Sequence, residues 1–466
     1  MTVDVTIIGG GVSGLATAWE LKAAGYSVAL LERQARPGGN AVSERIGGFL
    51  MEHGPSTVDA RAEAALDYSR TLGLEGERCR LGAGVRNRYL VGGGVLKGIP
   101  AHPLGFLRSD YLSLAGRLRM LIEPAIPRGK AGVEESIADF CARRFGAEFS
   151  SRVMEPLVRG IYGGDAATLS IGAVFPALLA FEQRHGSIAR GVMQSRWAGR
   201  KMPGRRLYSW RDGVGSLPRA LAARLGNSIH TGVAVRRITR MGSLFRIDTG
   251  RDGMLSARAV VLATQPHVAA QLLDRLDDMA ADAAGGIDAP PVAVVYLGYR
   301  REQVDHPLDG LGFFAARGEG RGLNGAQFCS TMFDGRAPQG HVAIAGYFGG
   351  DGAPDLGRGP APAPELMALA REEFADLLGA HGEPVVARVR HWPRGLPQYR
   401  LGHAARVQVL NHLPDRVPGL FLTGNYFDSP SIGACLARAR DVAARVQLET
   451  ASSVSCPARR SIPAFS

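Results

Sequence analysis

The chain has 466 residues, of which 45% are hydrophobic, so it is long enough for two or three domains that each bury an apolar core. It carries 55 lysines and arginines against 43 acidic residues, but only four of these cations are lysines, and the arginines are scattered along the chain. This spread is more typical of a compositional bias than of a nucleic-acid-binding arm, so we expect no nucleic-acid partner. Attraction to an anionic lipid surface is the alternative explanation for the excess charge.

The five cysteines predict neither a disulfide framework nor a metal site. Their number is odd, they lie far apart, and none forms a CxxC pair. The lack of a disulfide pattern among the cysteines predicts that the protein works in a reducing compartment, the cytoplasm. The first predicted strand begins at residue 3, which leaves no room for a signal peptide, and no apolar run approaches the roughly 18 residues needed to span a bilayer. Any contact with the inner face of the cell membrane is therefore expected to be peripheral.

The N-terminal residues predict a βαβ unit. Residues 3–8 form a short β-branched apolar run, residues 13–24 have helical periodicity up to the stop at Gly25, and residues 27–31 form a second apolar run. Two strands joined by a helix imply a parallel sheet. The expected fold class is therefore α/β.

A GxGxxG turn lies between the first strand and the helix. Gly9 allows the tight turn, Gly11 lets the backbone approach a pyrophosphate at the helix N-terminus, and Gly14 permits close helix packing. Glu32, at the end of the second strand, is placed to accept hydrogen bonds from a ribose. These features together predict a dinucleotide site, which either NAD or FAD would fit.

The rest of the chain predicts further regions. Residues 104–179 carry apolar residues at helical spacing and indicate a helical insertion. Residues 257–263 form a predicted buried strand that returns the chain to the first sheet, and residues 292–299 open a stretch of hairpin-like strands. Near the end of the chain, residues 420–424 form a predicted strand and residues 432–446 a predicted helix. Residues 450–466 are a polar tail that we expect to be disordered.

Further glycine turns indicate which dinucleotide is bound. Residues 36–39 (Arg-Pro-Gly-Gly) follow Glu32 closely, and residues 52–57 (Glu-His-Gly-Pro-Ser-Thr) come after a predicted hairpin. Near the C-terminus, residues 419–426 and 431–433 give a strand, a turn and a helix N-terminus, whose backbone N–H groups are suited to an anionic flavin group. The pattern resembles that of the flavin-binding amine oxidase and protoporphyrinogen oxidase superfamily.

The resemblance narrows in the middle of the chain. Residues 136–140 (Ser-Ile-Ala-Asp-Phe), 160–165 (Gly-Ile-Tyr-Gly-Gly-Asp) and 396–403 (Leu-Pro-Gln-Tyr-Arg-Leu-Gly-His) follow one another as in porphyrinogen oxidases. Amine oxidases and carotenoid desaturases do not share this run in the same form. Over nearly its whole length the chain therefore resembles the protoporphyrinogen oxidase and coproporphyrinogen III oxidase family. It departs from that family at Asn40, where a basic residue is common, and at Ala316, where a proline is frequent.

The resemblance implies a domain organisation and a cofactor. The expected fold has an FAD-binding Rossmann-like domain in three parts, a mainly β substrate domain and a helical insertion for membrane contact. We expect the FAD-binding parts at residues 1–82, 201–275 and 396–449, the helical insertion at 83–200 and the substrate domain at 276–395. FAD is expected to be non-covalent, because no Cys or His lies in a recognisable flavin-linking motif.

The resemblance also implies which residues bind the substrate and the cofactor. Arg88 is expected to pair with a propionate of the substrate, and Gly163 to contact the substrate. The residues expected to bind the cofactor are Gly9, Gly10, Gly11, Val12, Ser13, Gly14, Glu32, Arg33, Gly38, Gly39, Gly54, Pro55, Ser56, Thr57, Val235, Trp392, Ser431, Ile432 and Gly433. We assign no side chain as a catalytic base, interpret His185 and His403 as turn residues, and expect no metal.

The activity that the resemblance implies is FAD-dependent oxidation of protoporphyrinogen IX to protoporphyrin IX, with dioxygen as acceptor, in haem biosynthesis. The nearer alternative is oxidation of coproporphyrinogen III to coproporphyrin III, whose four carboxylates need more positive charge in the pocket. An amine oxidase, an isoprenoid desaturase, or a flavin-bearing binding protein without turnover are the more distant alternatives. The suggested partners are a membrane surface, the next enzyme of the haem pathway and a second copy of the chain in a homodimer.

Overall fold

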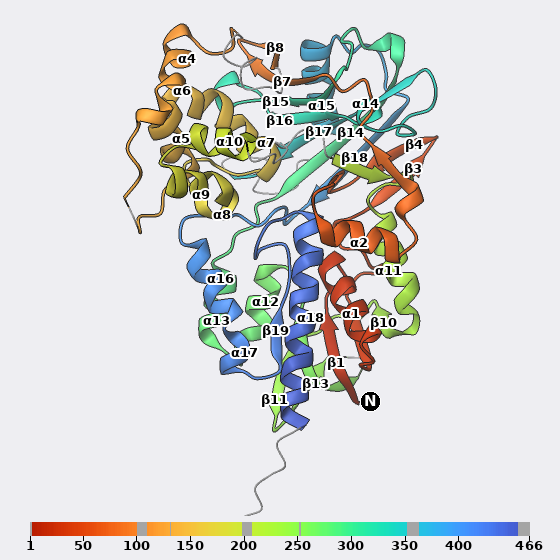
Figure 1. Ribbon diagram of the computed structural model, residues 1–466. Coiled ribbons are helices and arrows are strands. Elements are labelled where there is room, and N and C mark those ends of the chain that lie inside the picture. The colour runs from red at the N-terminus through yellow and green to blue at the C-terminus, as the bar shows by residue number, and fades with distance from the viewer. Residues whose placement is uncertain are drawn as a thin grey trace, which may run out of the picture.

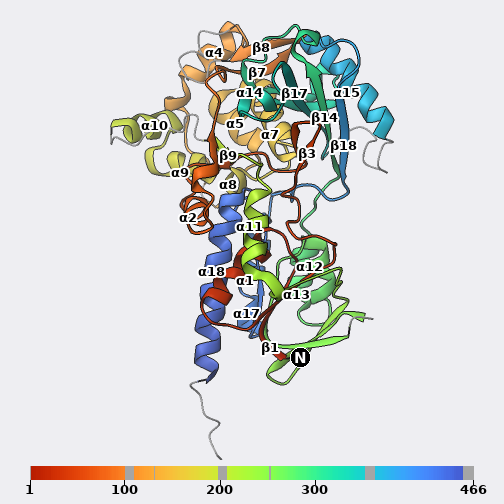
Figure 2. The same ribbon diagram turned by 90° about the vertical axis from the view of Figure 1, so that its right-hand side faces the viewer.

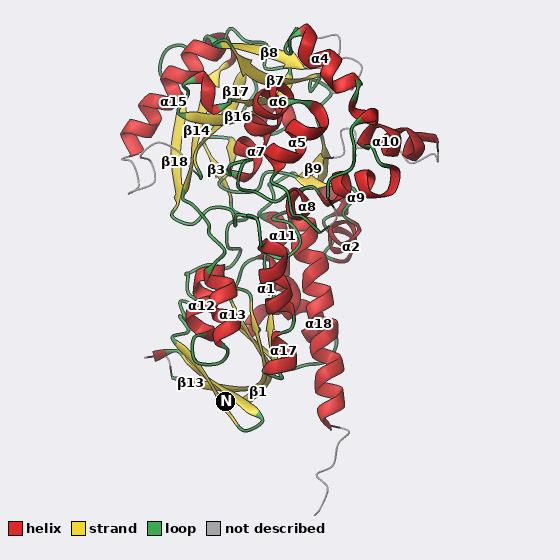
Figure 3. Ribbon diagram, turned by 90° about the vertical axis from the view of Figure 1, so that its left-hand side faces the viewer, coloured by secondary structure: helices red, strands yellow, loops and turns green. Residues whose placement is uncertain are grey.

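The computed structural model describes residues 2–99, 110–130, 132–197, 207–250, 253–351 and 363–454. Figure 1 shows an elongated molecule with a narrow lower part and a broader upper part. The lower part contains the first strand and the last helix, so both ends of the chain contribute to it (Figures 1 and 2). The upper part contains a large sheet with a group of helices beside it (Figure 3).

The lower part is built on a sheet with a parallel centre. Its strands lie in the order β10 (Ile229–Thr231), β2 (Val28–Glu32), β1 (Thr2–Ile8), β13 (Met254–Leu262), β12 (Leu244–Asp248) and β11 (Arg237–Met241), and β19 (Leu420–Leu422) pairs with β13. β1 is parallel to both β2 and β13. All five residues of β2 are buried, as expected for a strand covered on both faces. The predicted βαβ unit and the return of the chain to the first sheet are confirmed.

Helices cover both faces of this sheet. On one face, α1 (Val12–Ala23), α11 (Ser216–Leu225) and α18 (Ile432–Val454) share an apolar core that includes Leu15 and Leu436. On the other face lie α12 (Pro266–Leu273), α13 (Asp278–Gly285), α16 (His403–Asn411) and α17 (Leu413–Arg416). Burial on two faces explains why the central strands are continuous apolar runs in the sequence.

The end of the chain differs from its prediction. Helix α18 continues to Val454, so residues 450–454 of the predicted disordered tail are helical. Val446 is fully buried, and the Thr450 hydroxyl bonds the Val446 carbonyl at 2.8 Å and the Tyr26 hydroxyl at 2.9 Å. These contacts hold the last turns against the domain. Residues 455–466, the rest of the predicted tail, lie outside the described residues.

The upper sheet confirms a mainly β substrate domain. Its order is β18 (Val386–Trp392), β14 (Val292–Arg300), β17 (His341–Gly349), β16 (Leu323–Phe328), β15 (Gly310–Phe314), β7 (Asn87–Gly92) and β8 (Val95–Ile99). Side chains of β14 alternate between the faces. Val295 and Leu297 pack beneath α15 (Ala363–Leu378), whereas Tyr296 packs against the hairpin of β3 (Ser43–Ile46) and β4 (Phe49–Glu52).

Strands β7 and β8 correct one expectation. Residues 87–99 were expected at the start of the helical insertion, but they form a hairpin that pairs with β15 and extends the upper sheet. The turn is Gly93-Gly94, where both residues have positive φ, as two-residue hairpin turns require. The helical region therefore begins after this hairpin.

The helical region packs around its own apolar core. Its elements are α4 (Leu114–Leu121), α5 (Ile137–Phe145), α6 (Ala147–Phe149), α7 (Glu155–Tyr162), α8 (Ile171–Val174), α9 (Pro176–His185) and α10 (Ile188–Trp197), with a π-helical segment over Ser150–Met154 between α6 and α7. Ile137, Phe140 and Val158 are fully buried in this core. The predicted helical character is confirmed for the described residues, whereas residues 100–109, which include the predicted start, lie outside them.

Short elements complete the structure near the junction of the two parts. β5 (Val58–Asp59), β9 (Leu207–Trp210) and β6 (Arg78–Arg80) form a small antiparallel sheet. Helices α2 (Glu63–Thr71) and α14 (Cys329–Met332) follow β5 and β16. The chain thus crosses between the two parts several times, and residues from both can meet at the junction.

Candidate functional site

The glycine turn after β1 is shaped by close backbone contacts. Gly9 has φ +108°, and a Cβ atom there would lie 2.5 Å from the Ala263 carbonyl oxygen. A Cβ atom at Gly14 would lie 1.9 Å from the Gly9 carbonyl oxygen. A Cβ atom at Gly11, in contrast, would meet no atom within 4 Å. Gly9 and Gly14 are therefore required by the protein's own packing, while Gly11 opens space at the N-terminus of α1 that suits a phosphate group.

Glu32 closes one side of this turn. It ends β2 and is 8% exposed, and its carboxylate accepts hydrogen bonds from the backbone N–H of Gly10 at 2.6 Å and of Gln34 at 2.8 Å. Because each carboxylate oxygen has a second lone pair, Glu32 can still accept hydrogen bonds from ribose hydroxyls. The predicted role of Glu32 therefore fits its position, and Arg33 follows it directly.

Two further glycine segments lie against the first turn. The Gly38 N–H donates to the Gly10 carbonyl at 2.7 Å, and a Cβ atom at Gly39 would lie 3.0 Å from the Gly11 Cα. A Cβ atom at Gly54 would lie 2.2 Å from the Asn40 carbonyl oxygen, so residues 54–57 pack against the second segment. The structure thus brings together three of the predicted cofactor segments, which are up to 40 residues apart in the sequence.

The N-terminus of α18 lies beside that of α1. Burial raises the pKa of the Cys435 thiol, in the first turn of α18, to about 11, and a hydrogen bond with Ser13 in the first turn of α1 opposes this. The Ser431 hydroxyl accepts from the Ala434 N–H at 3.2 Å, and a Cβ atom at Gly433 would lie 2.4 Å from the Ala62 Cβ. Two helix N-termini therefore lie close together at the predicted site, where their partial positive charges favour an anionic ligand.

Trp392 and Val235 approach the same region from other segments. The Trp392 indole N–H, at the end of β18, donates to the His53 carbonyl at 2.5 Å, so this ring lies next to residues 54–57. The Arg390 guanidinium lies 4.3 Å from the centre of the Trp392 ring. Val235 follows Val233, whose N–H donates to the Glu32 carbonyl at 2.9 Å. Trp392 thus contacts the residue before one predicted cofactor segment, whereas Val235 is placed near Glu32 through its neighbour Val233.

The two predicted substrate residues lie apart. Arg88 is exposed on β7, and no described residue forms a hydrogen bond or ion pair with its side chain. Gly163, with φ +58°, ends α7 close to the start of β14. Three strands separate β14 from β7 in the sheet, about 19 Å at the usual spacing of strands. A ligand that touches both residues must therefore be long.

A half-buried polar cluster was not predicted from the sequence. The hydroxyls of Ser56 and Tyr347 donate to Gln327 Oε1 at 2.8 and 3.0 Å, which joins the predicted cofactor segment to strands β16 and β17. Gln327 lies two residues before Cys329 and lines a small cavity with Glu52 and Ser56. The only sequence signal was that Glu52 and Ser56 belong to one motif.

Glu52 and Arg336 are the charged members of this cluster. Burial raises the pKa of the Glu52 carboxyl to about 7, although a hydrogen bond from Ser43 and the Arg336 charge oppose the rise. Glu52 Oε1 lies 3.6 Å from Arg336 Nη2 and accepts from the Val214 N–H at 2.9 Å. Glu52 lies in a motif that carried the resemblance, yet the sequence alone did not show that it pairs with Arg336.

The two histidines that were set aside as catalytic bases lie outside the glycine segments. His185 ends α9, and its ring lies 6.3 Å from that of Phe181. His403 begins α16 and is buried, and its Nε2 has no hydrogen-bond partner. His403 therefore directly follows a turn at residues 401–402 and is the first residue of a helix. Within the described ranges, no group of His, Cys, Asp and Glu side chains is arranged to hold a metal ion.

Comparison with known proteins decides what this arrangement is. The family described as flavin containing amine oxidoreductase matches residues 12–447. The chain belongs to this family. Because the glycine cradle, the two helix N-termini and Glu32 also fit a dinucleotide, the protein is an FAD-dependent oxidoreductase, as predicted. In the described part of the chain, no helix is both long and apolar enough to cross a membrane.

Several known proteins are similar to this chain over most of its length. A chloroplastic protoporphyrinogen oxidase of Oryza sativa subsp. japonica is 31% identical over 96% of this chain and 88% of its own length. A coproporphyrinogen III oxidase of Bacillus subtilis (strain 168) is 26% identical over 93% of this chain and 95% of its own. The fold matches a provisionally assigned protoporphyrinogen oxidase of Exiguobacterium sp. 255-15 with a TM-score of 0.84, at 24% identity over 96% of this chain and 99% of that one.

Proposed function

We propose that this flavoprotein oxidises protoporphyrinogen IX to protoporphyrin IX, with dioxygen as the final electron acceptor. Relatives named protoporphyrinogen oxidase and coproporphyrinogen III oxidase, similar over more than nine tenths of the chain, support a porphyrinogen substrate. The observation that carries the choice of substrate is one face of the β7–β8 hairpin, which presents two cations.

The register of the hairpin places four side chains on this face. Arg88 pairs with Ile99, and Leu90 pairs with Lys97, so all four point the same way. Leu90 and Ile99 pack against the helical region with Tyr111. Lys97 Nζ lies 3.7 Å from a carboxylate oxygen of Asp110, a long contact to an exposed partner.

The two cations suit a substrate with two carboxylates at one edge. The planar guanidinium of Arg88 would donate two hydrogen bonds to one propionate. The ammonium of Lys97 would neutralise the charge of the other. Coproporphyrinogen III carries two more carboxylates, and the paired strands β7 and β8 themselves offer no third cation on this face. The distance between Arg88 and Gly163 also suits a substrate of macrocyclic size rather than a small amine.

The chain contributes position and charge to the reaction. Bound FAD supplies the redox chemistry, since it accepts two electrons at a time, and three such steps with three molecules of dioxygen give the porphyrin and hydrogen peroxide. Glu32 and the turn at Gly11 would hold the ribose and the pyrophosphate. Ser56 and Gln327 join the cofactor segment to the substrate sheet, which fixes the distance between the two reactants.

Porphyrin fluorescence and oxygen uptake test this proposal directly. Purified, FAD-loaded protein is incubated with protoporphyrinogen IX or with coproporphyrinogen III, and protein stripped of FAD measures spontaneous oxidation. We expect a higher kcat/KM for protoporphyrinogen IX. A higher kcat/KM for coproporphyrinogen III would reassign the substrate, and rates equal to the stripped control with both compounds would refute a porphyrinogen oxidase.

We further propose that helix α4 contacts a membrane surface. Leu114, Leu118, Leu121 and Ile122 are each more than half exposed, and their spacing places them on one face of the helix. Such a stripe is typical of a helix that lies in the lipid interface. It lies in the same helical region as the Tyr111 contact with the substrate hairpin, so an apolar substrate could pass from lipid to the site.

Sedimentation with vesicles tests the membrane contact. We expect the protein to sediment with phosphatidylcholine vesicles and to be released by detergent more readily than by salt, because apolar burial is not screened by ions. The variant Leu114→Gln/Leu118→Gln/Leu121→Gln should stay in solution, whereas Met279→Gln, which changes an exposed side chain of α13, should not differ from wild type. Binding only to vesicles that also contain an anionic lipid, with release by salt, would assign the contact to the scattered arginines instead.

A further inference from the structure

Arg390 lies on the face of the upper sheet that meets the predicted cofactor segments. It stands near the end of β18, an edge strand, and antiparallel pairing places it beside Val294 of β14. Val294 packs with Phe49 and Met51 of the β3–β4 hairpin, and side chains directly opposite one another point to the same face of a sheet. Arg390 was not among the residues that the sequence predicted to bind the cofactor, although Trp392, two residues further on, was.

The Arg390 guanidinium is held in place, yet its outer donors have no partner in the protein. It lies over the Trp392 ring, whose indole N–H donates to the His53 carbonyl at 2.5 Å, directly before residues 54–57. In the described part of the chain, no residue forms a hydrogen bond or ion pair with this guanidinium. Its Nε is enclosed, whereas the two Nη groups are not. Both Nη groups are therefore accessible donors for a ligand.

Arg36 brings a second cation to the same place from the cofactor half. It belongs to the glycine segment that follows Glu32, in which the Gly38 N–H donates to the Gly10 carbonyl at 2.7 Å. Arg36 is exposed and has no hydrogen-bond or ion-pair partner among the described residues. Partial burial lowers the pKa of its guanidinium, the charge of Arg390 lowers it further, and the charge of Glu32 opposes both. The two guanidinium groups are therefore close enough to repel each other.

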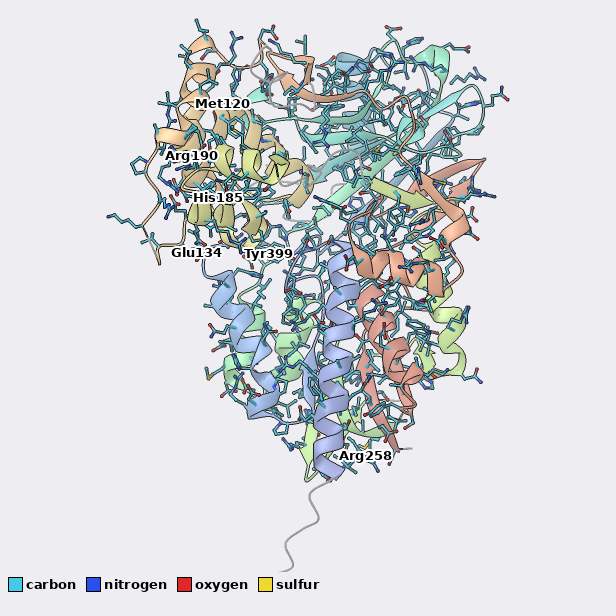
Figure 4. The ribbon with its side chains drawn as sticks, viewed as in Figure 1. Met120, Glu134, His185, Arg190, Arg258 and Tyr399 are labelled. Atoms are coloured by element: carbon cyan, nitrogen blue, oxygen red, sulfur yellow. The ribbon has the colours of Figure 1, made fainter. Side chains whose placement is uncertain are left out.

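The acid nearby does not pair with these cations. The Glu32 carboxylate accepts from two backbone N–H groups, at 2.6 and 2.8 Å, and forms no ion pair with Arg36 or Arg390. Figure 4 shows Arg258 at the lower end of the molecule, where it donates to Asp4 at 3.0 Å, and such pairing with an acid is common among the arginines of this protein. Two unpaired cations held close together destabilise the protein unless an anion binds between them.

A second pair of arginines extends the positive region. Arg33 directly follows Glu32, and Arg394 lies two residues after the end of β18. Burial lowers the pKa of His267, and the charges of Arg394 and Arg33 lower it further, so both arginines lie near this ring. The segment after Glu32 and the end of β18 thus contribute two arginines each. Such a concentration of positive charge favours an anionic ligand.

The pyrophosphate of FAD is the anion that this position suits. Its expected place is the open space at Gly11, at the N-terminus of α1. A Cβ atom at Gly39 would lie 3.0 Å from the Gly11 Cα, so the segment that carries Arg36 borders that space. A pyrophosphate linkage carries two negative charges, which two guanidinium groups can neutralise.

Asn40 explains why a cation from another strand is useful at this point. It is neutral at a position where the family commonly has a basic residue. A Cβ atom at Gly54 would lie 2.2 Å from the Asn40 carbonyl oxygen, and Gly54 follows the His53 whose carbonyl holds the Trp392 indole. Asn40 and Arg390 are thus linked through neighbouring contacts, and Arg390 can supply the charge that Asn40 lacks.

We propose that Arg390 is a further cofactor-binding residue, whose Nη groups donate hydrogen bonds to the pyrophosphate of FAD opposite Arg36. Because β18 belongs to the substrate sheet, cofactor binding then joins the two halves through an ion pair as well as through the contact of Ser56 with Gln327. The assignment rests on FAD binding, and it holds whether the substrate is protoporphyrinogen IX or coproporphyrinogen III.

Release of FAD from the loaded, full-length protein tests the proposal. The protein is diluted into FAD-free buffer at about 0.01 M or about 1 M salt, where the screening length is about 30 or 3 Å, and the rise in flavin fluorescence gives the release rate. Arg390→Met keeps an apolar stem over Trp392 and removes the charge. At low salt it should release FAD about tenfold faster than wild type or more, because a charged hydrogen bond is lost. At high salt this ratio should be smaller, because salt weakens only the wild-type ion pair.

Arg388→Met is the matched control, since Arg388 is exposed on the same face of β18, opposite Tyr296. It should release FAD at the wild-type rate at both salt concentrations. Arg390→Lys keeps the charge and should release FAD more slowly than Arg390→Met. If Arg390→Met retains no FAD on purification, its affinity for added FAD at the two salt concentrations is compared with wild type in the same way.

Two results would overturn the role of Arg390. Release from Arg390→Met at the wild-type rate would show that its charge does not act on FAD, and a raised KM for the porphyrinogen in the same variant would assign Arg390 to a substrate carboxylate. A faster release with the same ratio to wild type at both salt concentrations would show looser packing around Trp392 rather than a lost ion pair.

Discussion

The cofactor half and the substrate half of this molecule present their sites in different ways. In the lower part, the site is formed by backbone that must come close to other backbone, as at Gly9 and Gly14. In the upper part, the proposed substrate site is formed by side chains that paired strands place on one face, as at Arg88 and Lys97. Glycines that allow close backbone approach can be recognised in a single sequence. Which side chains share one face of a sheet depends on the register of strand pairing, which a single sequence does not show.

The largest expected effect tests the packing of the glycine turn. Gly14→Ala places a Cβ atom 1.9 Å from the Gly9 carbonyl oxygen, and backbone must move to accept it. We expect a loss of about 3 kcal/mol or more in the free energy of unfolding, and no bound FAD. Chemical denaturation of the FAD-free protein and the flavin absorbance after purification measure the two effects.

Gly11→Ala is the matched control for this substitution. A Cβ atom there meets no protein atom within 4 Å, so the stability of the FAD-free protein should change by less than about 1 kcal/mol. The affinity for FAD should nevertheless fall, because the methyl group occupies the space left for the pyrophosphate. FAD binding as tight as in wild type would show that the pyrophosphate does not approach Gly11.

The same contrast explains which features the sequence predicted. The βαβ unit, the glycine turn and the position of Glu32 follow from local patterns, and the structure confirms the elements. The β7–β8 hairpin lies within residues 83–200, which the resemblance assigned to the helical insertion as one block, although Gly93-Gly94 marks a turn there. Gln327 and Tyr347 carry no motif, and they reach Ser56 only because β16 and β17 lie beside the predicted cofactor segment. Neither contact could be found without the fold.

The second prediction concerns the buried carboxyl where the two halves meet. Glu52 has a pKa of about 7 in the folded protein against an ordinary value of 4.5, so the folded state binds more protons between these values. Stability should therefore fall as the pH rises from about 4.5 to about 7, by at most about 3.4 kcal/mol from this group. Glu52→Gln should flatten this dependence, as measured by urea denaturation at pH 5 and pH 8.

An exposed carboxyl on the same hairpin serves as the control. Glu44 bonds His53 at 2.8 Å and is 45% exposed, so Glu44→Gln should leave the slope of stability against pH nearly as in wild type. A slope that Glu52→Gln does not change would mean that the Glu52 carboxyl titrates near its ordinary value in the folded protein.

The third prediction tests the proposed binding of a substrate propionate by Arg88. Arg88→Ala should remove a charged hydrogen bond worth about 1.5 to 3 kcal/mol, or about a 10- to 150-fold loss in kcat/KM for protoporphyrinogen IX. The FAD content should not change. Arg88→Lys should recover only part of the loss, because a point charge replaces the planar fork. Steady-state kinetics provide the measurement.

Arg86→Ala is the control for Arg88, since Arg86 is also exposed and precedes the strand. Its kcat/KM should stay close to that of wild type, because isolated surface charges contribute little. If both variants keep wild-type kinetics, Arg88 is a surface residue. If Arg88→Ala loses flavin as well as activity, the Arg88 side chain supports the cofactor site, and its assignment to the substrate site is wrong.

The smallest expected effect lies at the contact that joins the halves. Tyr347→Phe removes one of the two hydrogen bonds that Gln327 Oε1 accepts, while Ser56 keeps the other at 2.8 Å. One neutral hydrogen bond is worth about 0.5 to 1.5 kcal/mol, so kcat/KM should fall about 2- to 12-fold with FAD binding unchanged. Tyr299→Phe, a buried tyrosine on the opposite face of the sheet beneath α15, should leave kcat/KM at the wild-type value. Equal losses in the two variants would mean that Tyr347 acts through the stability of the sheet. A loss confined to Tyr347→Phe would instead show that the amide of Gln327 must be held from both sides, by a hydroxyl of the cofactor half and a hydroxyl of the substrate half.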